Sequence, residues 1–268
     1  MTSPSRSGSS PSSTSSRLTR SCTFVFYIAL FASPALELAA RAGGQELTRG
    51  DPDALYRERA HFANARAASE IWAARLAADS HDFESASKLA RAQYWLGTQG
   101  PIEARRAALE RGTSVSRRAT TISPSRPEGY FWMAANMGAL AESFGVRQGL
   151  KYRGAIKDAL ETVLRIDPAF QKGSADRALG RWYFKVPGLF GGSNKKSEEH
   201  LRASFAYDPD SIASHYFLAE TLLDEHRDQD ARDEVRRVLE APVDPDWVPE
   251  DEDFKHKARH LLERTRSR

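Results

Sequence analysis

The 268-residue sequence contains a single cysteine, Cys22, which lies in an N-terminal leader. Without that leader the chain has no thiol, which excludes cysteine catalysis, disulfides and zinc sites built on thiolates. A long hydrophobic run is also missing, because the most apolar stretch, Thr23 to Leu36, has 14 residues and a spanning helix needs about 20. The sequence therefore predicts neither a disulfide framework nor an ordinary transmembrane helix.

The same apolar stretch has the layout of an export signal. Arginines 6, 17 and 20 precede it, and the small residues of Ala40-Arg41-Ala42 follow it, as in a secretory signal peptide. We interpret residues 1–42 as a disordered leader and cleaved signal, and residues 43–268 as one exported, periplasmic domain. An uncleaved membrane anchor is the alternative, which Pro34 and Glu37 disfavour.

A strong net charge is absent once the leader is set aside. The whole chain has 39 basic and 36 acidic residues. Residues 1–42 hold four of these bases and one of these acids, so residues 43–268 hold 35 of each. A balanced chain gives no electrostatic reason to bind nucleic acid, and we predict no nucleic-acid partner.

Catalytic and cofactor-binding motifs are missing as well. The glycine-rich stretch before Lys195 has the outline of a phosphate loop, but Asn194 precedes that lysine where the motif needs glycine, and no strand leads in. His256 and His260 are spaced to share one helix face, but no third metal ligand is evident. No serine nucleophile in a glycine frame occurs. We predict a non-enzymatic protein without metal or cofactor, with a metal-dependent enzyme as a remote alternative.

Helix-forming patterns are abundant from Asp51 onward, where apolar residues recur three and four apart among good helix formers. Prolines mark helix ends at positions 124, 168, 209 and 242, with spacings of 44, 41 and 33. These spacings lie near the period of about 34 residues of tetratricopeptide repeats, which are pairs of antiparallel helices. The sequence predicts an all-α, tetratricopeptide-like array.

The register of the repeat is clearest in two units. The unit that begins at Ile212 places Leu218-Ala219 and Ala231 at consensus positions, and the unit before it carries Leu179-Gly180-x-x-Tyr183. Gly180 is expected to permit close helix approach, with an enlarged turn after it. A second enlarged turn is expected at Ser143 to Gly149. We predict four to five helix pairs and a C-terminal capping helix over 252–266.

First helices of such arrays line a concave face that binds partners. Aromatic residues cluster there, and about half of them must be core. The others, with nearby arginines, could bind organic anions or peptides. The apolar tip of the enlarged turn is a further candidate contact, and His215 is placed on the helix surface or in the groove. The candidate binding residues are Asn136, Arg177, Arg181, Trp182, Leu189, Phe190 and His215.

The most distinctive stretches between Arg126 and Arg264 are Ala135-Asn136-Met-Gly138, Arg177-x-Leu-Gly180 and Pro187-x-x-x-Gly191-Gly192. In them the sequence resembles the T-component family associated with TRAP transporters, which are exported tetratricopeptide-like proteins. The resemblance implies a scaffold that works beside a periplasmic solute-binding protein, associates as a homotrimer and passes a small organic ligand to a transporter. Family members are often lipoproteins, whereas this chain lacks a lipobox, so membrane attachment is not expected.

Two other interpretations stay open at this point. The chain could be a tetratricopeptide interaction protein with no part in transport. The regulator of microtubule dynamics group shares the helical pattern and a proline-containing loop between helices, but the export signal, bacterial in character, speaks against that group.

Overall fold

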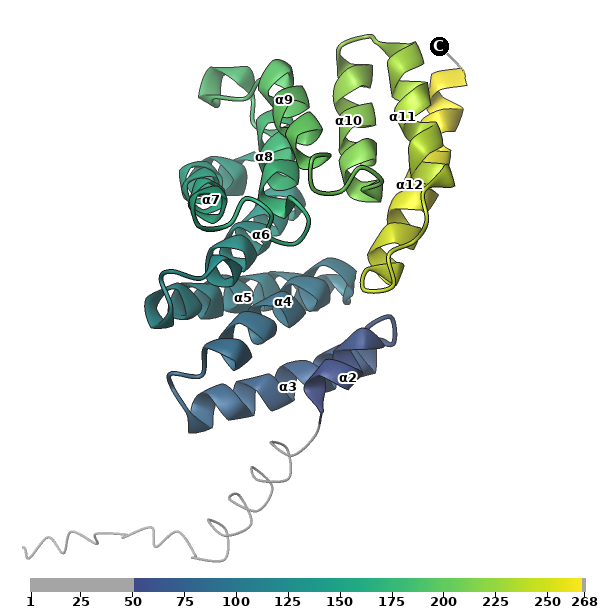
Figure 1. Ribbon diagram of the computed structural model, residues 1–268. Coiled ribbons are helices and arrows are strands. Elements are labelled where there is room, and N and C mark those ends of the chain that lie inside the picture. Colours follow the sequence, from purple (N-terminus) through teal and green to yellow (C-terminus); the bar gives the residue numbers. More distant parts are fainter. Residues whose placement is uncertain (1–50, 267–268) are drawn as a thin grey trace, which may run out of the picture. The chain divides into compact units, whose positions relative to one another are not determined.

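The computed structural model describes residues 51–266, all within one compact unit, and the predicted export signal lies outside the described residues. Within this range the chain is helical throughout and has no strand, as predicted (Figure 1). The helices are α2 (Pro52–Arg57), α3 (Phe62–Ala78), α4 (Phe83–Gln99), α5 (Ile102–Ile122), α6 (Pro127–Ser143), α7 (Val146–Ile166), α8 (Ser174–Lys185), α9 (Asn194–Ser204), α10 (Ile212–Asp224), α11 (Asp228–Glu240) and α12 (Val248–Arg266), with a 3-10 turn, η1 (Gly188–Phe190).

Several helices begin at side chains that cap their first free N–H groups. The Asp51 carboxylate accepts from the backbone of Asp53 and Ala54 at the start of α2, and Asp82 accepts from Ser85 at 2.9 Å in α4. Ser193 and Ser211 do the same for α9 and α10. Such caps stabilise a helix by about 1 kcal/mol each, so the polar residues between the apolar stretches set where the helices start.

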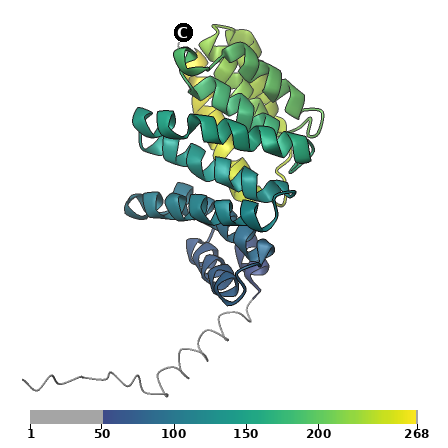
Figure 2. The same ribbon diagram turned by 90° about the vertical axis from the view of Figure 1, so that its left-hand side faces the viewer.

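The helices form consecutive antiparallel pairs, α2/α3, α4/α5, α6/α7, α8/α9 and α10/α11, and α12 packs on the last pair. Figure 2 shows these pairs stacked on one another. The first helices of successive pairs also touch, because α4 contacts α6, α6 contacts α8, and α8 contacts α10. We call the surface formed by α4, α6, α8 and α10 the first-helix face. The array has the predicted number of pairs and the predicted C-terminal helix.

The core runs through the array in clusters that join neighbouring pairs. One cluster centres on Trp72 and Leu89, a second on Met137 and Leu160, and a third on Val235. Gly180 lies at a close approach, because a Cβ there would come within 2.5 Å of the Leu201 side chain. The sequence-based reason for this glycine is therefore confirmed: it lets α8 and α9 touch.

Two details differ from the sequence-based expectation. The stretch Ser143 to Gly149 is not an enlarged turn, because α7 already begins at Val146. Gly145 makes the short connection possible by adopting a φ of 86°, which side chains disfavour. The last helix starts at Val248, four residues before the predicted boundary. No described helix combines the length and apolar character that crossing a membrane requires.

Candidate functional site

Arg181 ties three first helices together. From α8 it reaches Glu142 of α6 at 3.0 Å and Glu220 of α10 at 2.5 Å. Its guanidinium also lies over the Phe217 ring at 4.7 Å from the centroid. Arg181 thus lies on the first-helix face, and both of its ion-pair partners are carboxylates of the same chain.

A stretch of the chain's own backbone lies beside this face, where α12 packs on α10. Residues 244–253, here called the acidic segment, contain six carboxylates and lead into α12. Its Glu250 receives hydrogen bonds from Arg59, which follows α2, at 2.9 and 2.5 Å, and the carbonyl of Asp246 accepts a third at 2.7 Å. Asp244 accepts from Lys172, in the turn before α8, at 2.6 Å. The segment therefore contacts parts of the chain about 70 and 190 residues away.

Burial and neighbouring charges shift the pKa values of several groups beside this segment. Desolvation works against the charge of Arg59, but the bonds to Glu250 outweigh it and its pKa is raised. Among the described residues, Arg177 of α8 has no carboxylate bound to it and donates only to the Ser211 hydroxyl at 3.3 Å. Burial lowers the pKa of Arg177, and the nearby charges of Asp208 and Asp251 oppose this effect. Burial in turn raises the pKa of the Asp251 carboxyl.

Two of the residues predicted to bind, Asn136 and Trp182, are used in packing. Asn136 is fully buried and donates to the carbonyls of Ala90 and Trp132, at 3.1 and 2.8 Å, which joins α6 to α4. Trp182 is 9% exposed and its indole N–H donates to the carbonyl of Arg153 at 2.9 Å. In this structure neither polar group is available to a ligand.

His215 is also buried, and it lies between two acceptors. Its Nδ1 lies 2.5 Å from the Glu234 carboxylate of α11, and its Nε2 lies 2.9 Å from the carbonyl of Pro209. The ring stacks on Phe205 at 4.4 Å. His215 therefore connects α10 to α11 and to the turn before α10, rather than facing a groove.

The enlarged turn after α8 has the predicted apolar tip. Leu189 is 89% exposed and Phe190 is 39% exposed, with the Arg153 guanidinium over the Phe190 ring. Gly191 adopts a φ of 103°, and a Cβ at Gly192 would collide with the carbonyl of Val186. These glycines, with Pro187 before η1, shape the turn, whereas a Cβ at Gly138 would meet nothing.

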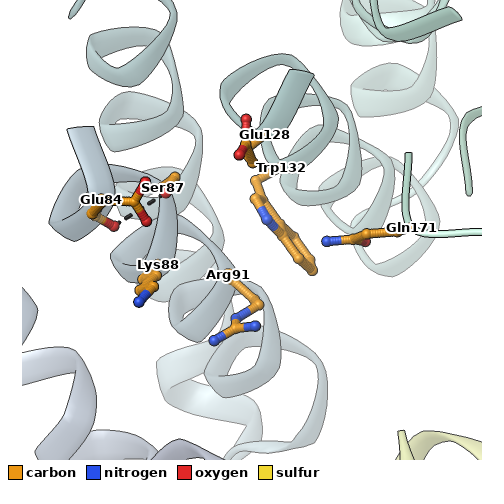
Figure 3. Close-up of a pocket in the computed structure, with 7 residues that line it drawn as sticks. All are labelled: Glu84, Ser87, Lys88, Arg91, Glu128, Trp132 and Gln171. Carbon is orange, nitrogen blue, oxygen red and sulfur yellow. Dashed lines mark hydrogen bonds between the residues drawn. The ribbon is translucent and has the colours of Figure 1, made fainter. Parts of the chain in front are cut away.

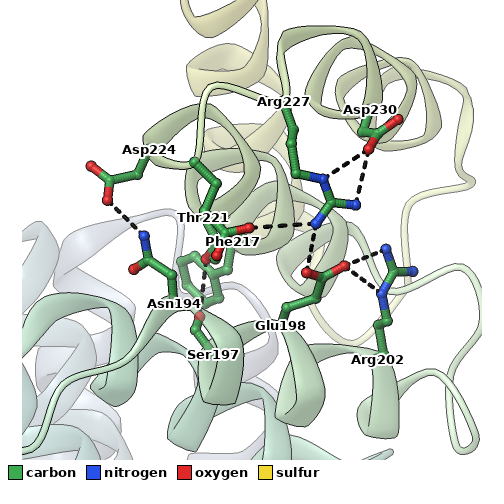
Figure 4. A network of polar contacts seen from close by, with 10 residues as sticks. Asn194, Ser197, Glu198, Arg202, Phe217, Thr221, Asp224, Arg227 and Asp230 are labelled. Carbon is green, nitrogen blue, oxygen red and sulfur yellow. Dashed lines mark hydrogen bonds and ion pairs between the residues drawn. The ribbon is translucent and has the colours of Figure 1, made fainter.

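A polar network joins α9 to α10 and to the start of α11 (Figure 4). Glu198 of α9 receives hydrogen bonds from Arg202 at 2.8 Å and from Arg227, next to α11, at 2.7 Å. Arg227 also bonds to Asp230. His256 and His260 lie on the surface of α12 with their Nε2 atoms 3.2 Å apart. Within the described part of the chain, no group of three or more metal-binding side chains is present.

Sequence reasoning missed Arg59, Arg91 and the acidic segment as a set. Arg59 and Arg91 flank the Tyr56 ring, at 5.2 and 4.3 Å from its centroid. The run of acids at 250–253 was visible in the sequence, but its contact with Arg59 spans 191 positions. Helical periodicity describes neighbours along one helix and carries no signal for such a distant pair.

This arrangement of paired helices is that of the tetratricopeptide class. A crystal structure of a thermophilic TPR protein from Thermus thermophilus matches with a TM-score of 0.59 at 21% identity, over 82% of this chain and 98% of that one. The crystal structure of MamA is less similar, with a TM-score of 0.46 and 14% identity over 75% of this chain and 95% of that one. No curated protein matches the chain in sequence.

Residues 53–190 match the family described as regulator of microtubule dynamics protein 1-3. The match spans more than half of the 268 residues, and the chain belongs to this family. This corrects the expectation that the predicted export signal places the chain outside that group. The comparisons support a tetratricopeptide-like fold and do not point to the TRAP transporter T-component family.

Proposed function

We propose that the chain is a protein-interaction scaffold that holds a polypeptide segment of a partner on its first-helix face. The observation that carries this proposal is the acidic segment, an internal stretch held beside this face by Arg59, which follows α2, and by Lys172, in the turn that leads into α8. Tetratricopeptide arrays present their first helices as a binding surface. No catalytic step is part of the proposal.

Site-specific crosslinking tests this proposal. A photoreactive benzoylphenylalanine replaces Phe184, which lies beside Arg181 on α8, or Glu199, which is exposed on the second helix α9. The expected result is a defined set of protein adducts from position 184 and few from position 199. Equal adducts from both positions would show that the first-helix face is not the binding surface.

A more specific version assigns the partner to a transport system. In this version the chain is exported, forms a homotrimer and binds the periplasmic solute-binding protein of a TRAP-type transporter. It is supported by the sequence resemblance through Gly138, Gly180 and Gly192, whereas the family match over residues 53–190 favours a partner unrelated to transport. If the purified chain binds no solute-binding protein in a pull-down, transport is excluded and the general scaffold proposal stands.

A further inference from the structure

Arg59 and Arg91 flank the same ring of Tyr56, but the two guanidinium groups differ in their hydrogen-bond partners. Arg59 has three hydrogen bonds to the acidic segment. Arg91 makes no hydrogen bond within the described residues, and its nearest carboxylate, Asp53, is 4.0 Å away and already holds Lys88 at 2.9 Å. The Nε of Arg91 is buried without a partner. A partly buried guanidinium with donors to spare favours an added acceptor.

A small cavity lies directly beside Arg91. It has a volume of about 140 Å³, is partly open to solvent and is lined by residues of α4, α6 and the turn between α7 and α8. Figure 3 shows the Trp132 ring of α6 between Arg91 and Gln171. Pockets for cofactors and drug-sized ligands measure about 300 to 1,000 Å³, whereas a cavity of about 150 Å³ holds a group the size of benzene. The space therefore suits one side chain of a partner.

The polar groups around the cavity decide which side chain fits. Its two carboxylates, Glu84 and Glu128, are both bound by Arg126. The donors that have no hydrogen bond within the described residues are those of Arg91, the indole N–H of Trp132 and the side-chain amide of Gln171. The unused capacity is mainly that of donors, which is complementary to a carboxylate and not to an ammonium or guanidinium.

Gln171 is held at the cavity by an unusual backbone. Gln171 and Lys172 adopt φ values of 44° and 57°, and Gly173 follows at 75°. Such values are costly for residues with side chains and persist where the surroundings impose them. Here Lys172 is anchored to Asp244 of the acidic segment at 2.6 Å. The acidic segment thus contacts the turn that carries Gln171.

The acidic segment also shows which chemical group binds to the cations of this region. Two cations that border the region, Arg59 and Lys172, are each satisfied by one of its carboxylates, Glu250 and Asp244. Arg91, beside Arg59 on Tyr56, is left over. A second acidic stretch, supplied by a partner, would place a carboxylate on Arg91, as the acidic segment does on Arg59 and Lys172.

We propose that the cavity at Arg91, Trp132 and Gln171 binds a glutamate or aspartate side chain of an acidic, extended segment of a protein partner. The carboxylate accepts from Arg91 and Gln171, and its methylene stem packs on the Trp132 ring. This inference rests on the proposed scaffold function and names the chemistry of the segment that the first-helix face holds.

Nuclear magnetic resonance of the full ¹⁵N-labelled chain tests this assignment directly. The probes are N-acetylglutamate amide, N-acetylglutamine amide and N-acetyllysine amide, and the readout is the indole N–H signal of Trp132, assigned with Trp132→Phe. We expect the glutamate probe to shift this signal in a saturable way and the other two to leave it in place. No shift with the glutamate probe, or an equal shift with the glutamine probe, overturns the proposal, and a response to the lysine probe alone would indicate a basic partner side chain.

Matched variants separate the site from a general charge effect. Arg91→Gln should lower the affinity for the glutamate probe about tenfold, as expected for loss of a charge-assisted hydrogen bond, and Gln171→Ala should lower it about threefold. Lys195→Gln removes the same charge at an exposed position on α9 and should leave affinity unchanged. If Arg91→Gln changes the circular dichroism spectrum, the fold of that variant is altered and Gln171→Ala provides the test instead. An unchanged affinity for the glutamate probe in Gln171→Ala then contradicts the site. Adducts at position 184 without a glutamate response would keep the scaffold and reject this cavity.

Discussion

At the scale of residues, buried polar side chains make specific contacts between neighbouring helices. The Gln93 amide of α4 donates to the Ser69 hydroxyl of α3 at 2.7 Å, and Ser204 of α9 donates to Ser214 of α10 at 2.8 Å. Asn136 plays the same part between α6 and α4. A buried polar group that loses its partner costs about 1 to 3 kcal/mol, so these contacts favour one register of each helix on the next.

Two helical glycines provide a matched prediction at this scale. Gly180→Ala places a Cβ 2.5 Å from Leu201, whereas Gly138→Ala meets no atom within 4 Å. We expect Gly180→Ala to lower the free energy of unfolding by about 1 to 3 kcal/mol and Gly138→Ala to raise it by about 0.5 to 1 kcal/mol, because alanine favours a helix over glycine. Urea unfolding followed by circular dichroism measures both, and a stabilised Gly180→Ala would contradict the close approach.

At the scale of elements, the helix pairs could be predicted because each pair produces a local pattern. Periodic apolar residues and the closing prolines sufficed for α4 to α11, and Leu179-Gly180-x-x-Tyr183 fixed the register of one pair. The candidate site was harder, because a first helix contributes to both core and surface. Periodicity places Asn136 and Arg181 on helices of the same class, but only packing shows that one is buried and the other lies on the face.

The contact between α9 and α11 predicts a specific acid dependence. Burial acts to raise the pKa of Glu198, but hydrogen bonds from Arg202 and Arg227 outweigh burial and the pKa lies below its ordinary value of 4.5. A lowered pKa means that Glu198 stabilises the fold above the unfolded-state value, and this contribution is lost as the pH falls through the folded pKa.

Glu198→Gln should therefore reduce stability at neutral pH and make the loss of stability below about pH 4.5 less steep. Urea midpoints measured between pH 3 and 7 provide the test. Glu199→Gln, one residue further on α9 and exposed, is the control that should keep the parent profile. An unchanged slope in Glu198→Gln would show that the two arginines do not hold this carboxylate in solution.

At the scale of the whole described unit, Arg59 changes how the array is expected to unfold. Repeat arrays are stabilised by contacts between neighbours, so their ends can fray independently. Here Arg59, between α2 and α3, is bound to Glu250 in the first turn of α12, and Trp247 lies 5.8 Å from its guanidinium. The two ends of the array are thus directly linked, which neighbour-by-neighbour reasoning from the sequence does not anticipate.

Glu250→Ala tests this link. The side chain of Arg59 is 5% exposed and that of Glu250 is 20% exposed, so the substitution leaves a buried guanidinium without its carboxylate. We expect a loss of about 2 to 4 kcal/mol, somewhat less than for a fully buried pair, and faster amide exchange in both α2 and the first turn of α12, with α6 and α7 unaffected. Asp253→Ala removes a carboxylate from the same helix, but its pair with Lys257 is exposed and should contribute below about 1 kcal/mol. Faster exchange confined to α12 would mean that α2 is stable without the link, and equal losses in the two variants would mean that Arg59 is solvated in solution.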